Sequence, residues 1–202
     1  ISEICREHNV LLHTDAAQTV GKIGTFVEEV GVDLLSVAGH KLYAPKGVGA
    51  LYVRRGVRLE PVMHGAGHEM GLRPGTENVP YIVGLGQACT LAFRSLEDSA
   101  RQLETLRDRL YTQLSQVIGG RLKVNGQQAD RLPNTLSVNF PDVAAAEMIT
   151  RLPELCVSIG SACHSGMAGM SPTLAAMGLD PDEARGTMRL SVGWFTSEEE
   201  ID

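Results

Sequence analysis

The segment DLLSVAGHKLYAPKGVGALYV at residues 33–53 has two short apolar runs separated by a polar, glycine-containing turn. Apolar runs of this length, bounded by Gly and polar residues, are typical of buried β-strands. The sequence therefore predicts strands at residues 33–37 and 49–53. The turn between them contains Gly39, His40 and Lys41.

An earlier apolar run, residues 10–12, is followed by His13-Thr14-Asp15, and we expect it to form a further strand. In open α/β sheets, ligands bind at the edge where the strands end. Asp15 and the Gly39-His40-Lys41 segment both follow predicted strands. We therefore expect them to lie at a ligand-binding edge.

Helical periodicity dominates the middle of the chain. Residues 2–8 and 81–93 are predicted to be helical, and Ser95-Leu96-Glu97-Asp98 resembles a capping box that starts a long helix. Gly119-Gly120 supplies its stop. Its apolar face is made by residues at spacings of three and four: Leu96, Ala100, Leu103, Leu106, Leu110, Leu114 and Val117.

The second half of the chain has the pattern of a smaller mixed fold. Strands are predicted at residues 121–124, 135–140, 156–159 and 188–192, and helices at 144–151 and 172–177. This order of elements predicts a compact α/β protein, with a boundary between two unequal parts near residue 95.

Composition restricts the classes of partner. The 202 residues include 18 Lys and Arg against 24 Asp and Glu, a net charge of −6, and no basic run. We therefore expect neither nucleic acid nor an anionic membrane surface as a partner. No apolar stretch approaches the roughly 18 residues that a membrane-spanning helix needs.

The cysteines and the first residues bear on compartment and completeness. Four cysteines without a C-x-x-C pair favour a reducing compartment, so a cytoplasmic location is expected and an organelle is the alternative. The chain opens on ISEICREHNV, without an initiating Met or a signal-peptide pattern. We expect it to be a piece of a longer protein.

Lys41 and Asp15 have the chemistry of a cofactor site. A partly buried lysine amine is a nucleophile, and a carboxylate such as Asp15 can pair with the pyridinium nitrogen of a lysine-bound pyridoxal phosphate. The structural alternatives are a surface lysine at a strand end and a helix N-cap.

Cys163 lies in Gly160-Ser161-Ala162-Cys163-His164, a stretch of small residues beside an imidazole. This setting favours a reactive thiolate, and a buried apolar cysteine is the alternative. His64 and His68 are spaced like helical metal ligands, but glycines separate them and no third ligand is nearby. We predict no metal site.

Six ordered stretches resemble one family, the cysteine desulfurases and selenocysteine lyases. These enzymes are fold type I pyridoxal-phosphate proteins of the class V aminotransferase group. The resemblance extends from residue 13 to the last residue. The stretches are HTDAAQ (13–18), GHKLYAPKGVGALYVRRG (39–56), RPGTEN (73–78), LPNTLSVNF (132–140), GSACHSG (160–166) and RLSVGWFTSEEEID (189–202).

The resemblance implies a pyridoxal 5′-phosphate site. Lys41 would hold the cofactor as a Schiff base, and Asp15 would keep its ring nitrogen protonated. Gln18 would bond the phenolic oxygen, and His40 would help to hold the phosphate. Thr76 matches a residue that reaches the phosphate of a neighbouring subunit's cofactor, which implies a homodimer with shared active sites.

Two further positions complete the implied machinery. Arg189 matches the arginine that pairs with the substrate carboxylate, for which a guanidinium fork is suited. Cys163 matches the nucleophile that takes sulfur from L-cysteine, leaving L-alanine and a Cys163 persulfide. That persulfide would pass to an acceptor protein for iron–sulfur cluster or thiocofactor synthesis.

The implied fold has two domains. Residues 1–95 would be the later part of the large pyridoxal-phosphate domain, with its mostly parallel sheet, and residues 96–202 a smaller α+β domain truncated at its end. Selenocysteine lyase, acting on L-selenocysteine, is the closest alternative activity. A class V aminotransferase-like protein and a non-catalytic interaction module are the remaining alternatives.

The sequence departs from the family pattern in several places. The family's N-terminal part is absent, including a His that stacks on the cofactor and a second phosphate-binding loop, so this stretch alone is expected to be inactive. Ala38 stands where the family often has a Ser, and this removes a phosphate hydrogen bond worth about 1 kcal/mol. Trp194 replaces a common Arg.

Overall fold

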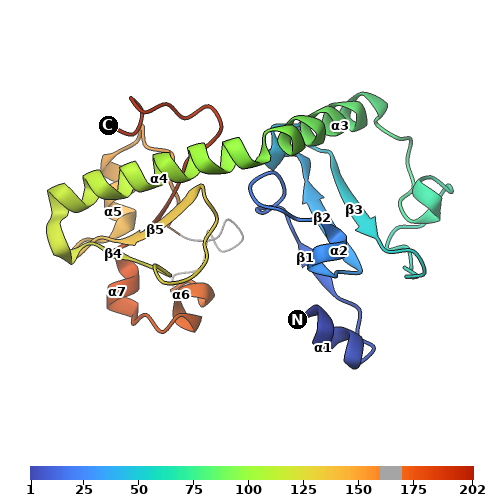
Figure 1. Cartoon of the computed structure of the whole chain (residues 1–202), viewed down its shortest axis with the longest axis horizontal. Helices are drawn as coiled ribbons and strands as arrows, with labels where there is room; N and C mark the ends of the chain where they lie inside the picture. The colour runs from blue at the N-terminus through green and yellow to red at the C-terminus, as the bar shows by residue number, and fades with distance from the viewer. Residues whose placement is uncertain (160–169) are drawn as a thin grey trace. The chain divides into compact units, whose positions relative to one another are not determined.

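A computed structural model gives the fold and describes residues 1–159 and 170–202 (Figure 1). The chain divides into two compact units, Ile1–Glu97 and Asp98–Asp202. Each unit has a sheet of three strands within the described residues. The assignment of these units to a large and a small domain of a pyridoxal-phosphate enzyme stays a prediction.

The first unit is built on a sheet in the order β1-β2-β3. Strand β2 (Leu34–Ala38) is central and pairs in parallel with β1 (His13–Asp15) and antiparallel with β3 (Gly49–Val53). The predicted strands at 33–37 and 49–53 are therefore present. The resemblance implies a mostly parallel sheet. In the sheet of this unit, β1 and β2 are parallel and β2 and β3 are antiparallel.

Strand β1 begins later than the apolar run at residues 10–12 predicts. The Asp33 carboxylate accepts the Leu12 N–H at 2.9 Å, and the Leu12 carbonyl accepts the backbone N–H groups of Asp33 and Leu34. Regular pairing with β2 starts only at His13. The apolar residues before it therefore lead into the strand without forming it.

Helices frame this sheet. They are α1 (Ser2–Glu7), α2 (Val27–Val30), the 3₁₀ turns η1 (Gly39–Leu42) and η2 (Glu69–Gly71), and α3 (Val79–Arg94). Helices at residues 2–8 and 81–93 were expected, whereas α2, only one turn long, was not. Asn78 starts α3 by accepting the Tyr81 N–H through its side-chain oxygen.

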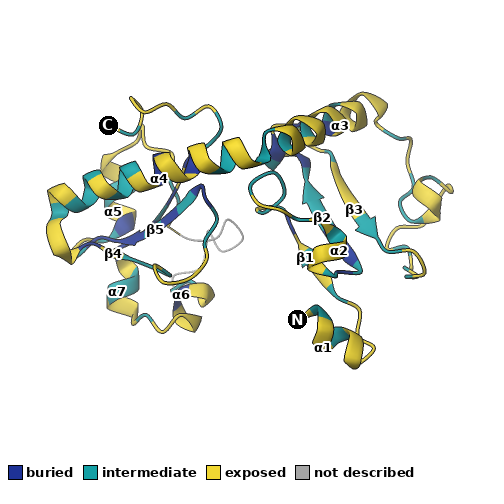
Figure 2. Ribbon diagram, viewed as in Figure 1, coloured by how far each residue is buried: buried dark blue, intermediate teal, exposed yellow. Residues whose placement is uncertain are grey.

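The core of the first unit is small (Figure 2). Ala16, Val32 and Leu35 are its buried centre. Partly buried residues from the surrounding elements pack against it: Leu12, Val20, Val27, Val37 and Tyr52. Because this core buries few apolar side chains, backbone pairing and polar contacts contribute much of the stability of the unit.

Arg54 supplies the most extensive of those polar contacts. Its guanidinium donates to the Val32 carbonyl at 3.1 and 2.9 Å, to the Val27 carbonyl at 3.2 Å, and to both carboxylate oxygens of Glu28. The Asp33 carboxylate lies 3.7 Å from Arg54 Nε. One side chain thus ties the end of β3 to α2 and to the start of β2.

The second unit has an antiparallel sheet in the order β4-β5-β6. Its strands are β4 (Lys123–Val124), β5 (Thr135–Asn139) and β6 (Thr187–Ser191). The strand expected at residues 156–159 is reduced to a single bridge, in which Ser158 and Arg189 exchange backbone hydrogen bonds. Three of the four predicted strands therefore form.

One face of this sheet is apolar and covered by helices. Leu136, Val138, Met188 and Leu190 form its centre, and Val138 is fully buried. The long helix α4 (Leu96–Ile118) and α5 (Ala145–Arg151) pack on it through apolar side chains: Leu110, Tyr111, Leu114, Ile118, Met148 and Ile149. The predicted apolar stripe of the long helix is a core face at Leu103, Leu106, Leu110 and Leu114. The prediction of its last member, Val117, is wrong, because that side chain is 86% exposed and Ile118 packs on the sheet instead.

One local expectation was wrong and one short helix was not predicted. The Ser95 hydroxyl donates to the Leu91 carbonyl at 2.9 Å, so it closes α3 and does not cap α4. The helix α7 (Pro181–Arg185) was not predicted, although Asp180 caps it at the Glu183 N–H and Pro181 occupies its first turn. The remaining elements of this unit are η3 (Gly119–Arg121) and α6 (Pro172–Ala176).

The chain after β6 folds back onto α4. Arg109 of α4 donates to both carboxylate oxygens of Asp202, at 2.8 and 2.7 Å, and also pairs with Glu198. Arg109 and Gln113 together hold the pKa of the Asp202 carboxyl below its usual value. Ser197 and Glu200 exchange a reciprocal pair of hydrogen bonds, the pattern of a capping box, within a turn.

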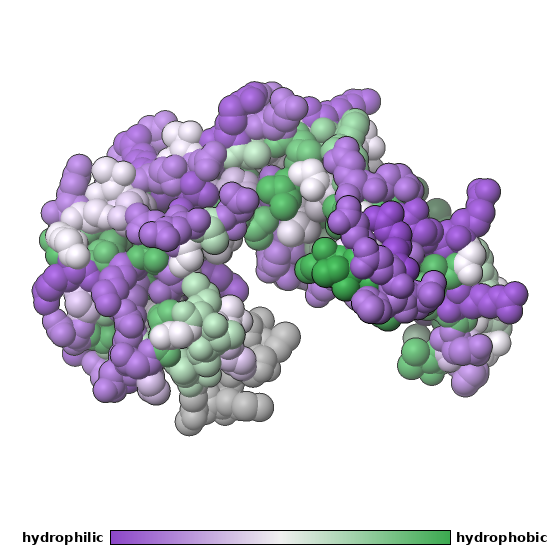
Figure 3. All heavy atoms as spheres, turned by 60° about the horizontal axis from the view of Figure 1, so that its bottom comes forward, coloured by the Kyte–Doolittle hydropathy of each residue, from purple (hydrophilic) through white to green (hydrophobic). Residues whose placement is uncertain are grey.

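Hydrophilic and hydrophobic residues are mixed on the face of the molecule that Figure 3 shows. Within the two described stretches, no helix is both long enough and apolar enough to span a bilayer. The long helix α4 alternates its apolar stripe with charged residues, as a helix on the surface of a sheet does.

We expect Arg54→Lys to lower the Tm of the protein by several degrees, because a lysine cannot reproduce the guanidinium's fork of hydrogen bonds. Arg55→Lys is the matched control, since the neighbouring Arg55 is exposed. Thermal unfolding of the two variants measures the difference. Equal Tm values for both would show that the Arg54 contacts add nothing to stability.

Candidate active site

The parallel strands β1 and β2 end side by side, and the predicted cofactor residues gather there. Asp15, the last residue of β1, is the register partner of Ser36 in β2. The turn η1, with His40 and Lys41, starts directly after β2. The structure thus brings Asp15, His40 and Lys41 to one edge of the first sheet, the expected ligand-binding edge.

Asp15 is held by its own chain. Its Oδ1 atom accepts the Ala17 N–H at 2.9 Å, so the carboxylate closes a local turn. The side chain is exposed, and the second oxygen, Oδ2, has no partner among the described residues. Asp15 therefore closes a turn with one carboxylate oxygen, and its other oxygen can accept a hydrogen bond from a protonated ring nitrogen.

The turn carrying Lys41 is fixed by a close approach of two backbones. Gly39 donates its N–H to the Val48 carbonyl at 3.1 Å, and a Cβ at position 39 would lie 2.6 Å from that carbonyl oxygen. Only glycine fits there. Leu85 of α3 packs on the same glycine, so η1 is held between β3 and α3. Lys41 is half-buried in this frame, and His40 is exposed.

A second lysine, Lys22, belongs to the same neighbourhood. Lys22 is half-buried. Burial, and secondly the charge of Lys41, lower the pKa of the Lys22 amine below its ordinary value. Its position in the turn after β1 explains why no sequence pattern identified it.

His13 and Ser36 form a further polar pair at this edge. His13 Nε2 lies 2.8 Å from Ser36 Oγ, across the β1–β2 pair. His13 and Asp15 are two residues apart on one strand, so their side chains share a face with Ser36. The register of the strands, which the sequence does not reveal, brings this pair together.

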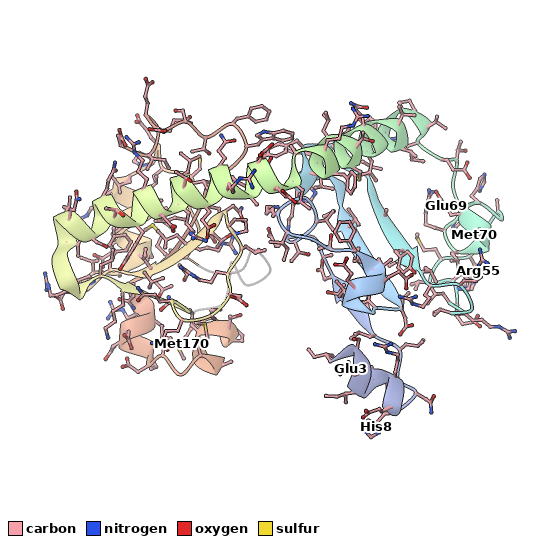
Figure 4. All side chains as sticks on the ribbon, viewed as in Figure 1. Glu3, His8, Arg55, Glu69, Met70 and Met170 are labelled. Atoms are coloured by element: carbon pink, nitrogen blue, oxygen red, sulfur yellow. The ribbon has the colours of Figure 1, made fainter. Side chains whose placement is uncertain are left out.

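Gln18 and Thr76 are placed less tightly. Gln18 is exposed in the turn that follows Asp15, and Thr76 is exposed between η2 and α3. In η2, Glu69 and Met70 both have left-handed backbone angles, with φ of 49° and 58°. Figure 4 shows the two side chains at this turn, and Met70 is 89% exposed.

Arg189 belongs to the second unit, on β6. It lines a cavity of about 230 Å³ beside Ser137 and Asn125, and Leu174 of α6 and the following Met177 contribute apolar lining. Cys163, the predicted nucleophile, and His164 lie outside the described residues. Elsewhere in the chain, as far as the structure describes it, no three His, Cys, Asp or Glu side chains gather as a metal site.

The edge of the first sheet fits the cofactor that the resemblance implies. Pyridoxal phosphate needs an amine for its aldehyde, a carboxylate for its ring nitrogen and hydrogen-bond donors for its phosphate. Lys41, Asp15 and His40 offer these groups, and the Asp15 Oδ2 atom has no described partner of its own.

Comparison with known proteins gives consistent matches. The aminotransferase class-V family model matches residues 1–202. Cysteine desulfurase IscS of Actinobacillus succinogenes is 45% identical, over 100% of this chain and 50% of that protein. The chain therefore spans about half the length of such relatives.

Solved structures agree. A NifS-like protein from Rickettsia africae superposes with a TM-score of 0.88 at 26% identity, over 99% of this chain and 53% of that one. SspA, solved in complex with cysteine, gives a TM-score of 0.73 at 37% identity, over 95% of this chain and 53% of that one.

We expect Lys22→Met to raise the Tm of the cofactor-free protein at pH 7. A lysine whose pKa is lowered by folding binds its proton less tightly in the folded state, so its charged form destabilises the fold. That penalty is complete below the folded pKa and disappears as the pH rises toward the ordinary value of 10.5. The gain in Tm should therefore shrink between neutral pH and pH 10.5.

Lys46→Met is the control, because Lys46 is an exposed lysine of the turn that follows η1. Thermal unfolding of both variants between pH 7 and pH 10.5 makes the comparison. A Lys22→Met gain that stays constant with pH would assign the effect to added apolar surface and not to charge.

Proposed function

Because the chain belongs to the aminotransferase class-V family, we propose that it acts as a pyridoxal-phosphate-dependent cysteine desulfurase. It would convert L-cysteine into L-alanine and leave the sulfur as a persulfide on Cys163. The similarity to cysteine desulfurase IscS supports this choice within the family. The single structural observation that carries the proposal is the placement of Lys41 and Asp15 at the same edge of one sheet.

The residues of the first unit would bind the cofactor and move one proton. When bound, pyridoxal phosphate supplies an electron sink for the substrate α-carbon. The Asp15 carboxylate holds the proton of the ring nitrogen, and His40 and Gln18 bind the phosphate and the phenolic oxygen. Lys41, after the substrate replaces it, has an unprotonated amine that takes the α-proton.

Arg189 and Cys163 would act on the substrate directly. The Arg189 guanidinium binds the α-carboxylate through two parallel hydrogen bonds. The Cys163 thiolate attacks the substrate sulfur, so that an S–S bond forms as the C–S bond breaks. The electron pair of the C–S bond stays with the carbon, which takes up a proton, and the carbon skeleton leaves as alanine after the α-carbon is protonated again. A cysteine with an ordinary pKa is only a few per cent thiolate at neutral pH, and we propose that His164 raises that fraction.

The proposed assembly is a homodimer. Thr76, exposed ahead of α3, would bind the phosphate of the partner's cofactor. The persulfide would pass to an acceptor protein in iron–sulfur cluster or thiocofactor synthesis, in the cytoplasm. Selenocysteine lyase remains the alternative activity, since both reactions use these same residues.

The full-length gene product, purified with pyridoxal phosphate, tests the proposal. We expect Lys41→Ala to lose the visible absorption band of the bound cofactor. Cys163→Ala should keep that band and lose sulfide release from L-cysteine by at least a hundredfold, because no other thiolate replaces the nucleophile. Alanine and sulfide release measure the activity.

Cys89→Ala is the matched control, since Cys89 is an exposed cysteine of α3 outside the proposed site. A wild-type protein that binds no cofactor would refute the proposal. Faster release of selenide from L-selenocysteine, with sulfide release unaffected by Cys163→Ala, would favour the lyase instead.

A further inference from the structure

The sheet of the second unit has a polar face opposite its apolar one. In β5 and β6, Leu136, Val138, Met188 and Leu190 alternate with polar residues, and side chains two apart share a face. Thr135 faces Ser191, Ser137 faces Arg189, and Asn139 faces Thr187 across the antiparallel pair. Arg189 therefore stands in the middle of a row of hydroxyl and amide groups.

The row that contains Arg189 extends across the sheet. Ser137 is its direct partner on β5, and residues so paired have Cβ atoms roughly 5 Å apart. Asn125 continues the row beyond Ser137, since its N–H donates to the Ser137 carbonyl at 2.9 Å. Ser158 pairs with Arg189 on the other side.

The Ser137 hydroxyl is oriented by Asn125. The Asn125 side-chain amide Nδ2 donates to Ser137 Oγ at 3.1 Å, so Ser137 acts there as an acceptor. A hydroxyl has one proton to donate. In residues 1–159 and 170–202, no acceptor for that proton is found. The proton of Ser137 is therefore available beside the guanidinium of Arg189.

Arg189 also has no counter-charge among residues 1–159 and 170–202. No carboxylate or carbonyl in the described part of the chain pairs with its half-buried guanidinium. Partial burial of an unpaired charge is unfavourable, and a bound anion would offset it. The adjoining cavity, about 230 Å³, is smaller than the roughly 300–1,000 Å³ of pockets for drug-sized ligands.

We propose that Ser137 is a substrate-binding residue, which donates its hydroxyl proton to the carboxylate held by Arg189. Asn125 is the residue that positions it, through the Nδ2 contact to Ser137 Oγ. The ligand class is a small α-amino acid. This inference rests on the proposed function in one respect, since it takes the bound amino acid to be the substrate.

The direct test is calorimetric binding of L-alanine and L-alaninamide to the full-length, cofactor-loaded protein. The amide keeps the amine and the methyl group and lacks the carboxylate. We expect Ser137→Ala to weaken L-alanine binding about tenfold, the size of a hydrogen bond to a charged group, and to leave L-alaninamide binding unchanged. Ser137→Thr, which keeps the hydroxyl, should restore L-alanine binding.

Two further comparisons separate binding from folding. Ser191→Ala, a serine on the same face of β6, is the matched control and should bind L-alanine as the wild type does. Asn125→Ala should weaken L-alanine binding in the wild-type background and have no further effect in Ser137→Ala. If Asn125→Ala acted only by disturbing the fold, it would lower L-alanine binding in both the wild-type and the Ser137→Ala backgrounds.

The outcomes distinguish this inference from the proposed activity. Unchanged L-alanine binding in Ser137→Ala, or a wild type that does not prefer L-alanine to L-alaninamide, would overturn the role of Ser137. Preserved desulfurase activity in the same protein would then leave the proposed function standing. Selective loss of L-alanine binding in a protein without desulfurase activity would support the subsite and refute the proposed reaction.

Discussion

The guanidinium of Arg54 holds together the part of the first unit on which its binding edge depends. It bonds two carbonyls and a carboxylate of α2 and the loop after it, and it lies near Asp33. Asp33 in turn accepts the Leu12 N–H just before β1. Because the apolar core here is small, this network fixes where β2 begins. The register of β2 then sets the position of the turn η1, with His40 and Lys41, at its other end.

That far end is held as tightly as the beginning. Gly39 leaves no space for a side chain against the Val48 carbonyl, and Leu85 of α3 packs on it from another side. The short turn η1 is therefore rigid, and Lys41 emerges from it half-buried. A lysine on a closely packed turn, at the same sheet edge as a carboxylate held by its own backbone, has the features of a preorganised site.

The second unit uses a different device. Successive side chains of its strands point to opposite faces of the sheet. The apolar face packs under α4 and α5, and the polar face contains Arg189. Hydrogen bonds from buried polar residues support the polar face: Asn139 bonds the Glu183 carbonyl and Thr187. Arg107, buried on α4, donates to the Leu132 carbonyl and secures the loop before β5.

Much of this architecture was predictable because it depends on local pattern. The spacing of Leu103, Leu106 and Leu110 marks a helix wherever it packs, and β3 has the bounds that its apolar run predicts. The differences concern element ends and short elements. Ser95 bonds backward to α3, and the one-turn helices α2 and α7 were not predicted, although the capping chemistry of Asp180 and Pro181 is plain in the sequence. The strand expected at residues 156–159 is a single bridge.

The sequence by itself determined the kinds of chemistry present: a lysine after a strand, a carboxylate after another, and motifs shared with a pyridoxal-phosphate family. It also determined which strand faces are apolar, because alternation is local. Only the tertiary structure decided three contacts. The charge of Lys41 lowers the pKa of Lys22, and His13 bonds Ser36. Asn125 donates to the Ser137 hydroxyl beside Arg189. Such contacts join residues distant in sequence, and their geometry follows from strand register and chain reversal, which no local pattern encodes.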